Sequence, residues 1–278
     1  MIGMTVDELT ATLSTLPETP TMPVLFVGHG SPMHGIEDSV YARGWKTLGD
    51  TLPRPHAILA ISAHWLTDGT EVHVEEHPKT IHDFFGFPDE LYRLTYPAPG
   101  APTVAHATQA LVTDVAIKDD RHWGIDHGAW IVLHRMYPEA DVPVFQLSID
   151  IAQKGDFHYA LGRALAPLRR RGVLILGSGN IVHNLREVDF RPDAPEMDWA
   201  VRFDTKVAAH IEARTHQPLI DYPNMGADAL RAIPSPDHYF PLLSVLGAST
   251  PEDVVSFPVA GIDLGSISMR SVLFTPKQ

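Results

Sequence analysis

The stretch Pro23-Val24-Leu25-Phe26-Val27-Gly28-His29-Gly30-Ser31-Pro32 decides the fold of this chain. It begins with a short continuous apolar run, which is typical of a strand that is buried on both faces. The run leads at once into His29, which has a glycine on either side. Glycine lets the backbone turn sharply and approach a bound ion or molecule closely. The stretch therefore predicts a buried strand with a candidate functional histidine just past its carboxyl end.

The same arrangement recurs further along the chain. Residues 57–62 are an apolar run that leads into Ala63-His64-Trp65, and residues 173–176 lead into a glycine-rich segment that ends at His183-Asn184. A helical pattern over residues 39–52 separates the first two runs, which makes them parts of a β-α-β unit. Each of these predicted strands is therefore followed by a histidine.

The rest of the chain continues the alternation of strands and helices. Alternating elements form a largely parallel sheet that is covered on both faces. We therefore predict a single α/β domain over residues 23–278, with a central mostly parallel or mixed sheet and helices on both faces, and an N-terminal extension over residues 1–22. The further predicted strands are 70–75, 142–149, 254–257 and 267–274, and the further helices are 103–113, 155–170, 196–214, 227–233 and 239–246.

In such sheets, ligands bind in the crevice outside the carboxyl ends of the strands. This rule places His29, His64 and His183 along one rim of the predicted sheet. His127 stands beside an acid and a glycine, and His238 follows an acid and precedes a predicted helix, so both are further candidates. Three more histidines lie near these motifs, and the sequence leaves open whether their role is functional or structural. They are His34, His82 and His122.

The composition narrows the classes of function. The chain has 16 histidines and no cysteine, so metal chemistry falls to imidazole and carboxylate groups. A net charge of −13 argues against nucleic acid as a partner. The basic run 169–171 falls at a predicted helix end and is interpreted as complementing the helix dipole. No apolar run approaches the ~18 residues of a membrane span, and no signal peptide is seen, so we expect a cytoplasmic protein without a membrane partner.

Several common catalytic motifs are absent from the sequence. There is no H-E-x-x-H zinc motif, no G-x-S-x-G nucleophile elbow, no P-loop and no G-x-G-x-x-G pattern. A metalloenzyme whose ligands are dispersed along the chain fits the remaining features. The main alternative is a zinc-dependent hydrolase that uses the same histidine cluster to activate water. A weaker alternative is a metal-binding or ring-binding protein without turnover.

Taken together, the histidine motifs resemble those of the class III extradiol ring-cleavage dioxygenases, of the 4,5-DOPA dioxygenase type. The resemblance extends from Pro23 to the C-terminus, and its specificity comes from the order of the motifs rather than from any one of them. The motifs are Gly28-His29-Gly30-Ser31-Pro32, Ser62-Ala63-His64-Trp65, Asp126-His127-Gly128-Ala129-Trp130, Gly179-Asn180-Ile181-Val182-His183-Asn184 and Asp237-His238-Tyr239.

The resemblance implies that residues 23–278 are a catalytic domain that opens a catechol ring, DOPA-like or a related aromatic diol, with O₂ to a muconic semialdehyde-type product. It implies one divalent metal, Fe(II) for turnover, with Zn(II) as an alternative occupant in the isolated protein. Protocatechuate-type relatives have a glutamate where this chain has His238 as the third ligand. The oligomeric state stays open. The implied metal ligands are His29, His64, His183 and His238; the implied acid–base residues are His127 and His183; the implied pocket residues are Ser31, Trp65, Trp130 and Tyr239.

Overall fold

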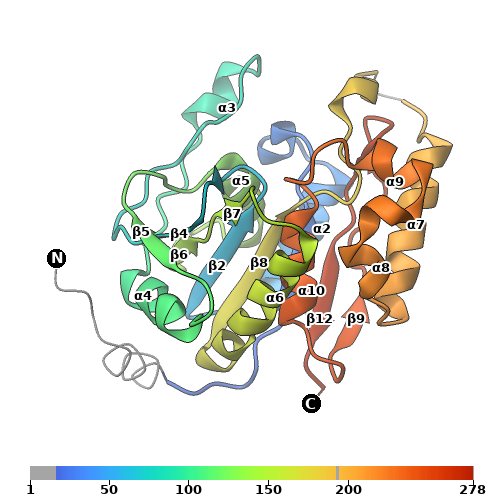
Figure 1. The fold of residues 1–278 in the computed structure, drawn as a ribbon. Coiled ribbons are helices and arrows are strands. Elements are labelled where there is room, and N and C mark those ends of the chain that lie inside the picture. The colour runs from blue at the N-terminus through green and yellow to red at the C-terminus, as the bar shows by residue number, and fades with distance from the viewer. Residues whose placement is uncertain (1–16, 192–193, 278) are drawn as a thin grey trace.

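The computed structural model describes residues 17–191 and 194–277 (Figure 1). Most of the predicted N-terminal extension, residues 1–16, lies outside the described residues. The end of the extension is joined to the body of the protein, because the backbone N–H groups of Thr19 and Met22 donate to the carbonyl oxygens of Arg170 and Arg169 at 3.0 and 2.8 Å.

The central sheet is mixed, with strand order β6-β2-β8-β1-β12-β9. The four strands from β6 to β1 are parallel, and β12 and β9 continue the sheet in antiparallel fashion. This confirms the predicted mostly parallel or mixed sheet. The strand bounds are β1 Val24–Gly28, β2 Ala57–Ser62, β6 Val144–Gln146, β8 Val173–Gly179, β9 Val254–Ser256 and β12 Val272–Thr275.

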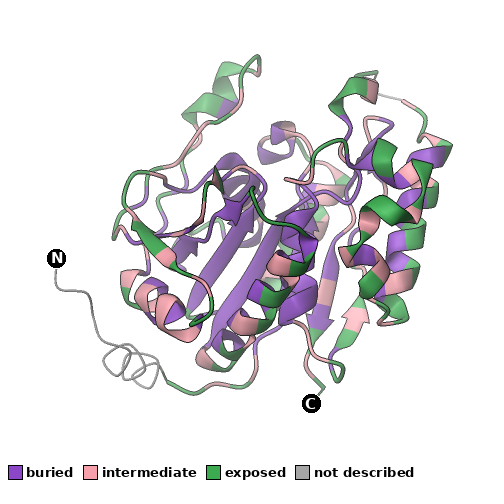
Figure 2. Cartoon of the chain, in the orientation of Figure 1, coloured by how far each residue is buried: buried purple, intermediate pink, exposed green. Residues whose placement is uncertain are grey.

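Helices cover both faces of this sheet, as the sequence predicted. Alternate residues of β1 point to opposite faces, so that Phe26 joins the core under α6, α7 and α10, whereas Val27 joins the core under α2 and α5. The central strands are buried along their whole length (Figure 2). The helix bounds are α2 Val40–Thr51, α5 His127–Met136, α6 Gly155–Leu165, α7 Asp198–Glu212 and α10 Phe240–Ala248.

Smaller elements surround this core. No helix of the described chain is long and apolar enough to cross a membrane. The short strand pairs are β3 Leu66–Thr67 with β7 Ile149–Asp150, β4 Thr70–His73 with β5 Ile117–Asp120, and β10 Ile262–Asp263 with β11 Ile267–Ser268. The short helices are α3 Asp89–Arg93, α4 Pro102–Leu111, α8 Gln217–Ile220 and α9 Ala227–Ala232, and the 3₁₀ helices are η1 Pro32–Gly35, η2 Ala166–Arg171, η3 Leu185–Glu187 and η4 Tyr222–Met225.

Three predicted elements are divided in the structure. Residues 142–149 form β6 and the start of β7 rather than one strand. The helix predicted over 155–170 changes to the 3₁₀ helix η2 where Pro167 lacks the N–H that an α-helix needs. The strand predicted over 267–274 is broken, because the N–H groups of Met269 and Ser271 donate to the carbonyls of Gly261 and Val259 instead of to a neighbouring strand.

The strands β1, β2 and β8 end at the same edge of the sheet, and this edge is where a site can form. Gly28 pairs with Gly179, and Ser62 pairs with Ser178, so the carboxyl ends of the three strands lie side by side. The chain leaves each strand at this edge, and a residue that follows directly is held beside the residues that follow the neighbouring strands.

Candidate metal centre

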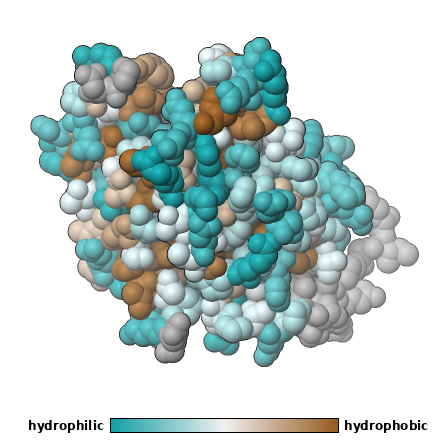
Figure 3. Space-filling model, turned by 180° about the vertical axis from the view of Figure 1, so that it is seen from behind, coloured by the Kyte–Doolittle hydropathy of each residue, from teal (hydrophilic) through white to brown (hydrophobic). Residues whose placement is uncertain are grey.

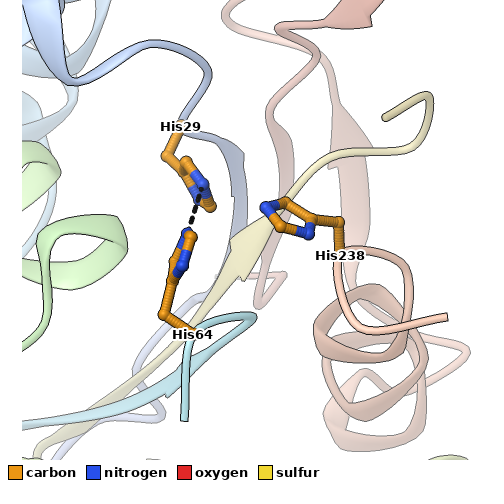
Figure 4. Close-up of side chains that lie close together, drawn as sticks. All are labelled: His29, His64 and His238. Carbon is orange, nitrogen blue, oxygen red and sulfur yellow. Dashed lines mark hydrogen bonds between the residues drawn. The ribbon is translucent and has the colours of Figure 1, made fainter. Parts of the chain in front are cut away.

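Three histidines from separate segments point their rings toward one another at this edge of the sheet (Figure 4). His29 directly follows β1, His64 lies two residues after β2, and His238 lies two residues before α10. Their ring centroids are 5.0 to 5.2 Å apart. One possible donor atom from each ring lies within 4.8 Å of those of the other two. The structure therefore brings together three of the predicted ligands.

The proton on His29 is fixed by Ser178. The Ser178 hydroxyl donates its only hydrogen to the Gly128 carbonyl, so it can only accept from the His29 ring. The His29 Nδ1 atom lies 3.0 Å from this hydroxyl oxygen and therefore carries the ring hydrogen. The Nε2 atom of His29 keeps its lone pair and faces the centre of the cluster.

The other two rings are held in the same way by carboxylates. Asp237 lies against Nδ1 of His238 and accepts its hydrogen. Asp83 Oδ2 lies 3.4 Å from Nδ1 of His64, which is an ion-pair contact and not a hydrogen bond. In His238 the Nε2 atom is left with a lone pair. Such carboxylate partners on the outer nitrogen orient metal-binding histidines and raise their basicity.

This arrangement fits a divalent metal ion. The Nε2 atoms of His29 and His64 lie 3.1 Å apart, and this contact is a hydrogen bond when His64 carries its hydrogen on Nε2 (dashed line in Figure 4). Two nitrogens bound at about 2.1 Å to one ion in tetrahedral geometry would lie about 3.4 Å apart. A cation could take the place of this hydrogen and bind both nitrogens. The three-imidazole donor set suits zinc, iron and copper better than magnesium or calcium.

The ligand histidines are neutral at physiological pH. Burial, followed by the neighbouring histidines, lowers the pKa of His29 and His238 well below the ordinary value. Burial also lowers the pKa of His64 to about 4, although Asp126 and Asp83 oppose this shift. A neutral ring is the form that binds a metal. Protons therefore do not compete for these three nitrogens near neutrality.

Asp83 links the cluster to His127, which is the first residue of α5. The backbone N–H of His127 donates to Asp83 Oδ1 at 2.9 Å. The His127 Nδ1 atom also lies 2.9 Å from this oxygen, but off the line of a hydrogen bond, so it counts as an ion-pair contact only. Burial raises the pKa of Asp83, but contacts with His127 and His64 outweigh it and lower the pKa overall. Sequence reasoning missed Asp83, whose neighbours show no strand or helix pattern.

Asp126 fixes the direction in which α5 enters the site. Its Oδ1 atom caps the helix by accepting from the backbone N–H of Ala129 at 3.2 Å, and it accepts from the Ser62 hydroxyl at 2.6 Å. That hydroxyl accepts in turn from the backbone N–H of His64 at 3.3 Å. Asp126 is fully buried, so one carboxylate holds the backbone next to both His64 and His127 in place.

His183 lies beside the cluster rather than within it. Its ring stacks flat on that of His238, with centroids 3.4 Å apart and planes 4° apart. His183 is not one of the three convergent histidines, but it forms another possible metal-binding group with Asp237 and His238. Burial lowers the pKa of His183 to about 4, so the ring is neutral at physiological pH. The resemblance implied both a metal-ligand role and a proton-transfer role for His183, and both stay predictions.

A cavity of about 410 Å³ opens directly onto the cluster. Ser31 lies in its wall, as expected, and caps η1 by accepting from the Met33 N–H. The histidines in the wall are His29, His64, His127, His183 and His238.

The aromatic residues expected in the pocket, Trp65, Trp130 and Tyr239, are not among the residues that line the cavity. All three are almost completely buried in the core. Trp65 stacks on Trp123 at 5.7 Å, and the Trp130 and Tyr239 polar atoms donate to backbone carbonyls at 2.8 and 3.2 Å. Core aromatics with a satisfied polar atom need no exposure to a ligand. The cavity takes its aromatic rings from Phe84, Phe85, Phe87 and Phe190 instead.

The three histidines left open by the sequence have structural surroundings. His34 contacts Asp263 at 3.2 Å and Ser39 at 3.0 Å, and thereby fixes η1. The His82 ring donates to a backbone carbonyl at 2.8 Å and packs on Phe84 and Trp130. His122 is exposed.

Replacing Ser178 with alanine is expected to weaken metal binding. The change removes the oxygen that holds the His29 Nδ1 hydrogen, and loss of such an outer partner typically lowers metal affinity by about 10- to 100-fold. The measurement is competition with a chelator for the bound metal. Ser271→Ala is the matched control, because Ser271 is equally buried but its hydroxyl has no hydrogen-bond partner among the described residues. Equal affinities for the two variants would contradict the assigned role.

The metal-free protein is expected to lose stability in mild acid. Burial lowers the pKa of His64, His158 and His183 to about 4, whereas unfolded histidine titrates near pH 6.5. Between these values the unfolded chain binds more protons, so the free energy of unfolding falls as the pH falls. We expect a loss of at least about 3 kcal/mol between pH 7 and pH 5. Urea denaturation with a chelator present measures this; an unchanged midpoint would contradict it.

Comparisons with known proteins agree with this geometry. Residues 20–259 match the family described as the catalytic LigB subunit of aromatic ring-opening dioxygenase. A protein of Escherichia coli (strain K12) named 4,5-DOPA dioxygenase extradiol is 47% identical over 90% of this chain and 94% of its own length. A Beta vulgaris protein of the same name is 38% identical over 90% and 95%. The crystal structure of an uncharacterized protein from Escherichia coli K12 superimposes with a TM-score of 0.80 at 42% identity, covering 91% of this chain and 99% of that one.

Proposed function

The chain belongs to the family of the catalytic LigB subunit of aromatic ring-opening dioxygenase, and from this premise we propose that it opens the ring of a catechol beside its two hydroxyls, using O₂ and one divalent metal held by His29, His64 and His238. Membership makes it an extradiol ring-cleavage oxidoreductase that acts on a small aromatic molecule. The proposed substrate is DOPA-like or a related aromatic diol, and the proposed product is a muconic semialdehyde that has gained both oxygen atoms.

The convergence of three neutral imidazoles on one point carries the proposal. Neutral ligands leave the charge of a divalent ion uncompensated, which favours binding of an anionic catecholate. Three protein ligands also leave coordination positions for small molecules. Fe(II) in this site would supply the electron transfer that couples catechol to O₂, whereas Zn(II) is redox-inert. We therefore propose Fe(II) as the metal of turnover.

His183 and His127 are the proposed proton-transfer residues. Both line the cavity beside the ligands. His183 stacks on His238 at the edge of the cluster, where its ring can take a proton from a catechol hydroxyl and return it later. His127 lies against the Asp83 carboxylate, with its Nδ1 atom 2.9 Å from Asp83 Oδ1. Both histidines are therefore placed for proton exchange with a substrate in the cavity.

The test is reconstitution of the metal-free protein with Fe(II) or with Zn(II) under anaerobic conditions. Each sample is mixed with catechol, air is admitted, and O₂ uptake is followed together with the yellow colour of a semialdehyde. We expect uptake that matches product formation with Fe(II) and no uptake with Zn(II). Turnover with Zn(II) would contradict the proposed role of the metal. An absence of uptake with either metal, despite tight binding at the site, would contradict ring cleavage.

A further inference from the structure

Beyond the histidines, the wall of the cavity is apolar. Two segments that are far apart in sequence face each other across its mouth, one before α3 and one that begins at η3. The first contributes Phe84, Phe85 and Phe87, and the second contributes Leu185, Val188 and Phe190.

The outermost of these side chains are unusually exposed for apolar residues. Phe85 is 92% exposed, Phe190 is 81% exposed and Leu185 is 67% exposed. Figure 3 shows apolar side chains on both sides of the notch at the top of the molecule. Exposed apolar side chains that gather around one opening mark a binding surface. Because this opening leads to the metal centre, the molecule that covers them is expected to be the substrate.

The residues that line the cavity supply no permanent positive charge that would bind an acidic substituent. Among residues 17–191 and 194–277, those that line the cavity include no lysine and no arginine. The net charge of the chain is −13, which repels anions over a longer range. A carboxylate placed between the phenylalanines would lose water without gaining a partner.

The cavity is larger than a catechol ring needs. Its volume is about 410 Å³, whereas a space of about 150 Å³ holds a benzene ring. The difference leaves room for a substituent on the ring.

We infer that the preferred substrates are catechols whose ring substituent is apolar and uncharged, and that Phe85, Phe190 and Leu185 select this substituent by burying it. This inference rests on the proposed ring-cleavage function and narrows its substrate class. The amino-acid side chain of DOPA is a poorer match to this mouth than an alkyl group of the same length.

The experiment compares substrates of equal shape with the Fe(II)-loaded full-length protein. Dihydrocaffeate carries a carboxylate where 4-isopentylcatechol carries an isopropyl group, and unsubstituted catechol serves as the reference. From the burial of two methyl groups and the cost of desolvating a carboxylate, we expect kcat/KM to be about 30-fold higher for 4-isopentylcatechol. DOPA is expected to rank with dihydrocaffeate.

Variants of the mouth identify the residues responsible. Phe85→Ala is expected to lower kcat/KM for 4-isopentylcatechol by about 10-fold, with less than about a twofold change for catechol itself. Val254→Ala is the control, because Val254 is an exposed apolar residue on β9, away from the cavity, and it should change neither value.

The outcomes separate this inference from the function on which it rests. No O₂ uptake with any catechol, including the unsubstituted one, would overturn both. Turnover of catechol with an equal or higher kcat/KM for dihydrocaffeate or DOPA would overturn the inference alone. A preference for DOPA that disappears in Arg186→Ala would do the same, since Arg186 adjoins Leu185 and its guanidinium has no partner in the described part of the chain. A Phe85→Ala variant that changes only the oligomeric state would assign the mouth to a protein interface and also overturn it.

Discussion

Replacing His29 with alanine is expected to abolish both metal retention and O₂ uptake. His29 is the ligand with the most restricted ring, because Ser178 holds its Nδ1 hydrogen and its Nε2 atom lies 3.1 Å from that of His64. Its loss leaves two imidazoles, which bind a divalent ion far more weakly than three. We expect activity to fall by at least about 10³-fold, equivalent to about 4 kcal/mol of transition-state stabilisation. Metal analysis and O₂ uptake on the purified variant measure the two effects.

His77→Ala is the control for this experiment. His77 is exposed and lies in none of the groups of possible ligands, so the variant should keep its metal and its activity. Retention of stoichiometric metal by His29→Ala, with more than a tenth of the original activity, would show that the metal is held elsewhere.

Replacing Arg169 with methionine is expected to cost about 3 to 5 kcal/mol of stability, because it breaks a buried ion pair and leaves a carboxylate without its partner. Arg169 and Asp253 are 1% and 3% exposed and are joined by two hydrogen bonds of 2.8 Å. The guanidinium also donates to the carbonyls of Met22 and Ala248 at 2.8 and 3.0 Å. Urea denaturation measures the loss, and the activity of the folded protein should be unchanged.

The double variant Arg169→Met, Asp253→Leu separates the charge from the packing. Removing both charges leaves no unpaired carboxylate, and an apolar pair of similar volume is often as stable as the ion pair. We expect the double variant to regain most of the stability that the single variant loses. A single variant that loses less than about 1 kcal/mol, or a double variant that is no better, would contradict the role of this pair.

The parallel half of the fold could be predicted from the sequence because its strands are continuous apolar runs. The runs that became β1, β2 and β8 are buried throughout, and only such strands lack the alternation of a half-exposed sheet. Once those strands are parallel, their carboxyl ends must meet, and His29 and His64 follow as neighbours. His238 was not reached by this argument, since it precedes a helix; it was a candidate because of the acid before it and the helix after it, and only the resemblance implied that it is a ligand.

The parts of the fold and of the site that were not predicted show no periodic pattern in the sequence. The helix α5 was missed because eight of its ten residues are buried, so its pattern has no polar face. Asp83 and the phenylalanines of the cavity mouth lie in irregular chain, where spacing carries no information about neighbours. Arg169 was misread because its basic neighbours are typical of a solvated helix end, whereas its carboxylate partner, Asp253, is 84 residues away in sequence.

The most direct test of the central claim is to follow the oxygen atoms. The Fe(II)-loaded protein is given catechol under ¹⁸O₂. The ring-opened product is trapped, and its mass is measured by mass spectrometry. Extradiol cleavage at the three-histidine site predicts that both labelled atoms enter the product, and that His29→Ala forms none. A protein that consumes no O₂ under these conditions, and instead hydrolyses an ester or amide with zinc in the same site, would contradict the account and favour a zinc hydrolase.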